Sequence, residues 1–186
     1  MSVEGGALAP YAAGSWEVVP LTGVGPFRLG MKRAEAERVI ASFPAEPSIE
    51  AGGSGDRGWL SVDEHAIALD FEAGDLASVG LAYELLPSIV LEGEAVGGGH
   101  VLEVVHRLAR LSGDMRQIQG GSIVYPTLGL HFEQWDDYAT LNVLQAKALN
   151  GEPSAPITFA GAVDYYENGV GRGSAPSHVR SLPEPF

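Results

Sequence analysis

The sequence predicts an α+β fold built from two tandem αβββ-like halves, with the helices packed on one face of an antiparallel sheet. Each half contains one amphipathic stretch that predicts a helix, and shorter alternating stretches after it predict three strands. A chain of 186 residues can bury a hydrophobic core without disulfides, and this one contains no cysteine. The halves share an order of elements and few matched residues, so the order alone indicates a duplication.

Composition divides the chain into four segments. Residues 1–15 form a flexible lead-in, residues 16–92 the first half, residues 93–150 the second half and residues 151–186 a Pro/Gly-rich C-terminal extension. We expect the two halves to form one compact unit.

A short strand, a turn and a helix open the first half. Residues 16–19 predict an edge strand limited by Pro20, and residues 23–26 (GVGP) predict a tight turn. The apolar face of the helix has residues at i, i+3, i+4 and i+7: Ala36, Val39, Ile40 and Phe43. Pro44 ends this helix, because a proline ring clashes with the preceding turn.

Three predicted strands follow the first helix. Residues 51–58 (AGGSGDRG) predict a flexible loop before them. The strands are expected at residues 58–62, 65–71 and 77–84, with a hairpin turn at residues 72–75. Apolar residues alternate along the last two strands, which indicates one buried face and one open face.

The second half repeats this plan. Residues 87–99 join the halves and include a short strand at residues 89–91. Residues 100–112 predict a helix that ends at Gly113, a favourable C-cap. Its apolar face comprises Val101, Val104, Val105, Leu108 and Leu111.

Three further strands are predicted at residues 122–125, 128–135 and 139–145. Asp136 and Asp137 form the turn between the last two. In the C-terminal extension, residues 157–159 are candidates for pairing at a sheet edge.

The charge is strongly negative and unevenly distributed. The formal net charge is -13, and the window from Val39 to His106 contains twelve acids and one base, Arg57, which gives 1 - 12 = -11. Nucleic acid is an improbable ligand, because phosphate binding requires clusters of Lys and Arg. A basic protein partner fits this charge, and an acidic surface that only maintains solubility is the alternative.

The N-terminus has neither the basic residues nor the apolar run of a signal peptide. No stretch approaches the roughly 20 apolar residues of a membrane-spanning helix. The sequence therefore predicts a cytoplasmic protein without a membrane partner.

If both helices cover one face of the sheet, the opposite face is open. Strand alternation places on it Asp70, Ser78, Glu84, His131, Glu133, Trp135, Thr140 and Asn142. The residues predicted to bind a partner are Asp70, Glu84, His131, Glu133, Trp135 and Asp136. Trp135 is either a binding anchor or a cover for the sheet edge.

Enzymatic chemistry is not indicated. His100 and His106 are six residues apart and do not converge on one side of a helix, and no H-x-x-x-H or H-E-x-x-H motif occurs. Asp63 and Glu64 lie at a turn, where carboxylates usually accept local backbone hydrogen bonds. We therefore expect no catalytic residues, no metal and no cofactor.

Residues 23–40, GVGPFRLGMKRAEAERVI, resemble the segment that begins a helix in SmpA/OmlA-type lipoproteins and in the duplicated β-lactamase inhibitory proteins. The segment is also similar to short acidic immunity proteins of bacterial polymorphic toxins. The matching residues are Gly25, Leu29, Gly30, Met31 and Val39. Lys32 stands where those families usually place Thr or Ser, and the chain lacks a lipobox cysteine and disulfides.

The resemblance implies a binding scaffold, most simply an immunity protein. Together with the charge, it suggests a stoichiometric inhibitor that covers a basic active site of a toxin with carboxylates. One alternative is a non-catalytic domain that binds a small molecule in a cleft between the halves. A hydrolase with dispersed active-site residues is a further alternative.

Overall fold

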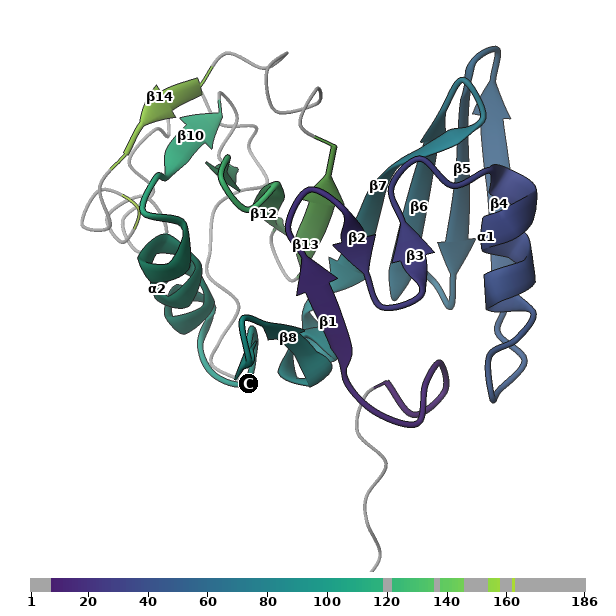
Figure 1. Ribbon diagram of the computed structural model, residues 1–186, viewed down its shortest axis with the longest axis horizontal. Helices are drawn as coiled ribbons and strands as arrows, with labels where there is room; N and C mark the ends of the chain where they lie inside the picture. Colours follow the sequence, from purple (N-terminus) through teal and green to yellow (C-terminus); the bar gives the residue numbers. More distant parts are fainter. Residues whose placement is uncertain (1–7, 119–121, 136–137, 146–153, 158–161, 163–186) are drawn as a thin grey trace, which may run out of the picture.

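A computed structural model of the protein shows two mainly antiparallel sheets (Figure 1). The helices lie between strands along the sequence. The structure describes residues 8–118, 122–135, 138–145, 154–157 and 162. Helices and strands are mixed and strands predominate, which confirms the α+β class.

The smaller sheet has five short strands. In spatial order these are β3 (Phe27–Arg28), β2 (Gly23–Val24), β1 (Trp16–Val19), β8 (Ile89–Leu91) and β9 (Glu94–Ala95). β1 runs parallel to β8 and antiparallel to β2, so it lies in the centre of this sheet. The prediction of an edge strand at residues 16–19 was wrong, because Pro20 lies just beyond β1 and leaves both of its edges able to pair.

The larger sheet has nine strands and is antiparallel throughout. In spatial order these are β14 (Ser154–Pro156), β10 (Arg116–Ile118), β11 (Ile123–Tyr125), β12 (Leu130–Trp135), β13 (Tyr138–Leu144), β7 (Asp75–Ala82), β6 (Ile67–Glu72), β5 (Arg57–Val62) and β4 (Ile49–Ser54). The strands of the first half meet those of the second where β7 pairs with β13. At this seam Val79 lies opposite Val143 and Leu81 lies opposite Leu141.

Both helices form where they were predicted. α1 (Arg33–Ile40) buries Ala36 and Ile40, but it ends at Ile40 and not at Pro44, so Phe43 lies beyond it. α2 (Val101–Ser112) buries the expected apolar face except Leu111, which is partly buried. His100 caps α2, because its Nδ1 accepts a hydrogen bond from the Leu102 backbone N–H at 3.3 Å. Gly113 ends α2 in the left-handed conformation, with φ of 67°.

Four strands of the large sheet follow α1 and five follow α2, rather than three after each helix. In the first half the extra strand is β4, because residues 51–58 form a hairpin with β5 and not a flexible loop. Gly53 makes this hairpin possible: a Cβ there would lie 2.3 Å from the Arg57 carbonyl oxygen. At the other end of the large sheet, β14 pairs with β10, and the Ile157 N–H donates a hydrogen bond to the Met115 carbonyl at 3.0 Å. The other two residues of the predicted pairing segment 157–159 lie outside the described residues.

Strand β7 begins and ends two residues earlier than predicted. It ends at Ala82, and residues Tyr83–Ser88 form a 3-10 helix, η1. Leu85 and Leu86 are adjacent in sequence and both are buried, which a helical turn permits and an alternating strand does not. Glu84 therefore lies on η1 and not on the open face of the sheet.

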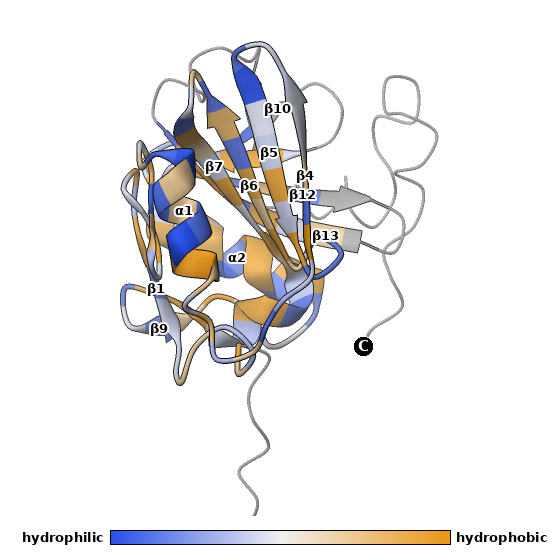
Figure 2. Ribbon diagram, turned by 90° about the vertical axis from the view of Figure 1, so that its right-hand side faces the viewer, coloured by the Kyte–Doolittle hydropathy of each residue, from blue (hydrophilic) through white to orange (hydrophobic). Residues whose placement is uncertain are grey.

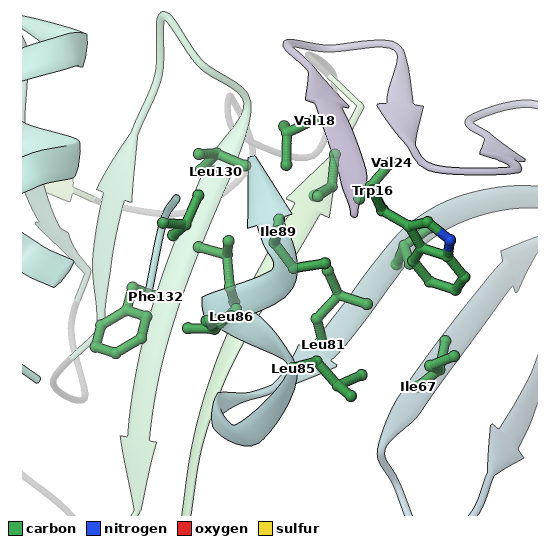
Figure 3. Packing of buried hydrophobic residues seen from close by; sticks show 14 of the residues in the cluster. Trp16, Val18, Val24, Ile67, Leu81, Leu85, Leu86, Ile89, Leu130 and Phe132 are labelled. Carbon is green, nitrogen blue, oxygen red and sulfur yellow. The ribbon is translucent and has the colours of Figure 1, made fainter. Parts of the chain in front are cut away.

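Both helices and both sheets contribute side chains to one hydrophobic cluster. In Figure 3, Trp16, Val18 and Val24 of the small sheet lie near residues of η1 and of the large sheet. Figure 2 shows hydrophobic positions interleaved with hydrophilic ones along the strands of the large sheet. β5, β6, β7, β11, β12 and β13 each direct one face into the core, whereas β4 buries none of its residues. The opposite face of these strands is the place to look for a site.

Tyr125→Phe is expected to reduce the loss of stability at alkaline pH. Burial raises the pKa of Tyr125 above its ordinary value of about 10. The stabilisation is therefore fully present below about pH 10 and is lost as the pH rises further, because the unfolded chain releases its proton first. For one group this loss is at most about 1.4 kcal/mol per pH unit.

Thermal melts at neutral pH and above about pH 10 measure this difference. The variant should lose less Tm than the wild-type protein over that interval. At neutral pH it should cost less than about 1 kcal/mol, because the Tyr125 hydroxyl donates only a long, 3.4 Å hydrogen bond to the Val105 carbonyl. Equal alkaline losses for the two proteins would contradict the assignment to Tyr125.

Candidate functional site

The face of the large sheet opposite the core is the candidate site, and we call it the outer face. Alternation along the strands and the pairing registers define it. It comprises Trp59 and Ser61 of β5, Ala68 and Asp70 of β6, Ser78, Gly80 and Ala82 of β7, Thr140, Asn142 and Leu144 of β13, and His131 and Glu133 of β12. Small and polar side chains predominate at these positions. Ser61, Ser78, Gly80, Ala82 and Thr140 are buried, so this face is not open throughout as predicted, and Trp59 and Asp70 are its exposed members.

Asp70 is an exposed carboxylate in a defined position on β6. Ser78, its register partner on β7, donates a hydrogen bond from Oγ to Asp70 Oδ2 at 2.8 Å. This bond orients the carboxylate and occupies one of its oxygens. The second oxygen, Oδ1, remains on an exposed residue of the outer face.

Trp59 is the large aromatic residue next to this carboxylate. It lies opposite Asp70 in the β5–β6 register and is 37% exposed. On its other side the indole covers Gly52 of β4, where a Cβ would lie 2.6 Å from the ring. Because Gly52 has no side chain, the indole ring can lie directly over β4.

Trp59 was not among the predicted binding residues, although the alternation of residues along its strand could have identified it. Leu60 and Val62 are buried, so strand alternation turns Trp59 to the other side. The strand was predicted to begin at residue 58, and the glycines before it were read as a loop. Without a neighbouring strand, nothing indicated that Trp59 lies on a broad surface.

His131 and Glu133 form a second polar pair on the outer face. Their side chains lie on the same side of β12, with His131 Nε2 3.4 Å from Glu133 Oε1. The two side chains are 14% and 27% exposed. Asn142 lies opposite His131 and places its Oδ1 over Gly80, where a Cβ would be 2.8 Å away.

The structure brings together three of the six predicted binding residues: Asp70, His131 and Glu133 share the outer face. Glu84 lies apart from them on η1. Trp135 ends β12 opposite Tyr138, but its side chain lies outside the described residues, as does Asp136.

The carboxylate of Asp63 at the β5–β6 turn has a structural role, but its partners are not the local backbone groups that were predicted. Asp63 Oδ1 accepts a hydrogen bond from the Ser48 backbone N–H at 2.8 Å, and Asp63 Oδ2 accepts one from the Tyr11 hydroxyl at 2.9 Å. Burial first, and then the hydrogen bond and charge of Asp63, raise the pKa of Tyr11. Asp63 thereby joins three segments that are distant in sequence.

Catalytic or metal chemistry gains little support from the described part of the chain. Ser61 Oγ lies 3.0 Å from His65 Nδ1, but Ser61 is 2% exposed and cannot easily reach a substrate. Among the described residues, no group of three His, Asp or Glu side chains could hold a metal ion. None of the helices described is long and apolar enough to cross a lipid bilayer.

Comparison with models of protein families, with curated proteins and with solved structures finds no match for this chain. The geometry and chemistry of the outer face are therefore the basis for a functional proposal.

Proposed function

We propose that this protein is a stoichiometric protein-binding inhibitor that acts through the outer face of its large sheet. The simplest form of this function is an immunity protein that neutralises a cognate bacterial toxin. The observation that carries the proposal is Trp59, an exposed aromatic residue beside the oriented carboxylate of Asp70. Tryptophan is among the residues that most often anchor protein interfaces.

The charge supports a basic partner. The chain has a net charge of -13, and the window from Val39 to His106 contributes -11 of it. β4, β5, β6 and β7 all lie within this window. Such a field accelerates encounter with a cationic surface and makes the association depend on salt.

The proposal includes the finer architecture: two duplicated halves that share one sheet, with the helices behind the outer face. The pairing at the seam supports it, because Gly80 lies opposite Asn142 between two apolar pairs. A twofold rotation about the Gly80–Asn142 pair would exchange the two halves, and it would place each apolar pair on the position of the other. Each half also places an acid opposite a hydroxyl residue, Asp70 with Ser78 and Glu133 with Thr140.

The alternative, a small-molecule site in a cleft between the halves, has weaker support. β7 and β13 pair directly over five residue pairs, so the large sheet is continuous where the halves meet. This alternative becomes one outcome of the binding experiment below.

Reversing charge on the outer face is expected to abolish capture of the partner. The variant carries Asp70→Lys and Glu133→Lys. The control carries Glu46→Lys and Glu92→Lys, which change the net charge equally at exposed loop and turn positions. The outer-face variant should bind the partner at least about 30-fold more weakly, whereas the control should stay within about threefold of the wild-type protein.

The measurement is a pull-down from a lysate of the source cells at low salt and at about 0.5 M salt, followed by titration of the captured protein. A basic protein that the control retains and the outer-face variant loses supports the proposal. Equal affinity of both variants would show that the outer face is not the interface. If no protein binds under either condition, thermal-shift screening with metabolites tests the small-molecule alternative.

A further inference from the structure

We propose that Trp59 and Asp70 together form a binding site for the guanidinium group of an arginine side chain. The site deepens the proposed function, on which it rests for one point only: the arginine belongs to the protein partner.

The two side chains are positioned to act on one ligand group. They are direct register partners on neighbouring antiparallel strands, a relation that places Cβ atoms about 5 Å apart. The indole occupies the space above Gly52, and the carboxylate is oriented by Ser78. Neither group has to be ordered by the ligand, which lowers the entropic cost of binding.

The chemistry of the pair favours a planar cation. A guanidinium group stacks on an aromatic face and donates hydrogen bonds to a carboxylate at its edge, whereas an ammonium group is a compact and more strongly hydrated charge. Asp70 Oδ1 is the acceptor for such a donor, because Oδ2 already receives the Ser78 hydroxyl. The same side of the sheet carries Glu50 and Glu72, which disfavour an anionic ligand.

Two basic residues on this side of the sheet have other acidic neighbours. Arg57 lies on the same side of β5, opposite Glu72 in the register. His131 lies beside Glu133 at 3.4 Å. Asp70, with Trp59 beside it, is therefore the carboxylate of the outer face to which we assign an external cation.

The test is a titration that needs no partner protein. N-acetyl-L-argininamide is added to the intact, ¹⁵N-labelled protein at low salt, and the indole N–H signal of Trp59 is followed by NMR. Trp59→Phe identifies that signal by its loss. N-acetyl-L-citrullinamide, which has the same shape without the charge, is the matched ligand control.

A saturable shift with the arginine compound and none with the citrulline compound is expected. Asp70→Asn should weaken binding about fivefold, whereas Glu46→Gln, an equal charge change in an exposed loop, should leave it within about 1.5-fold. Gly52→Ala tests the site without removing either group, because the new Cβ would displace the indole, and it should also weaken binding. The absence of a shift, or equal affinities of Asp70→Asn and Glu46→Gln, would overturn the site.

The titration and the pull-down test the site and the proposed function independently. If the arginine compound does not bind while the outer-face variant loses its partner, the site is wrong and the proposed function stands. If the arginine compound binds as expected while the outer-face variant keeps its partner, the proposed function is wrong and the site stands.

Discussion

Leu81→Ala is expected to lower the free energy of unfolding by about 3 kcal/mol. Leu81 lies on the core side of β7 and is fully buried. It is the register partner of Ile67 on β6 and of Leu141 on β13, so it packs on both sides of the seam between the halves. Truncation leaves a cavity where neighbouring strands cannot collapse without breaking their pairing.

Urea unfolding followed by circular dichroism and by tryptophan fluorescence measures this effect. Ile49→Ala is the control, because Ile49 is a β-branched residue of β4 that is 50% exposed, and it should cost less than about 1 kcal/mol. Since the large sheet is continuous, the two probes should report one transition for both variants. A cost for Leu81→Ala as small as that of the control would mean that the seam does not form as described.

Gly53→Ala is expected to cost about 3 kcal/mol, although it only adds one methyl group to an exposed strand. Gly53 has φ of +125°, a conformation that residues with a Cβ rarely adopt. The added Cβ would also lie 2.3 Å from the Arg57 carbonyl oxygen and 2.5 Å from Gly58 Cα. These are backbone atoms of the paired strand, so relief requires β4 to separate from β5.

Gly55→Ala is the matched control for this substitution. Gly55 lies in the turn of the same hairpin with φ of +62°, and a Cβ there would meet no atom within 4 Å. It should cost about 1–2 kcal/mol, the strain of the left-handed conformation alone. Thermal or urea unfolding of both variants gives the comparison, and similar costs for the two would refute the steric argument.

The sequence predicted those elements that have a clear period. The two helices were found because their apolar residues recur every three to four positions over two or more turns. The long strands β6, β7, β12 and β13 were found because their residues alternate. In the described part of these elements the buried residues fall mainly on one face, and burial imposes the pattern.

The missed elements lack such a period. β2, β3 and β9 have two residues each, which is too short for alternation to appear. β4 combines adjacent glycines with exposed side chains, so its pairing depends on backbone approach rather than on apolar residues. Glu84 was misplaced because alternation was extended past Ala82, where β7 gives way to η1.

The candidate site was predicted in part for a related reason. Alternation identifies which residues share a face, and it placed Asp70, His131 and Glu133 correctly on the outer face. It contains no information on which strands become neighbours. The contact of Trp59 with Gly52 and its place beside Asp70 arise from β4–β5 and β5–β6 pairing, which local sequence does not specify.

The pairing of β7 with β13 at the seam also has a consequence for the nascent chain during translation. The ribosome completes β7 well before β13, its partner across the seam, emerges. Until then a nascent chain whose first half has folded presents β7 as an open sheet edge, with backbone N–H and C=O groups available to other chains. The interval between the synthesis of these two strands is therefore when this protein is most exposed to misassembly with its own copies.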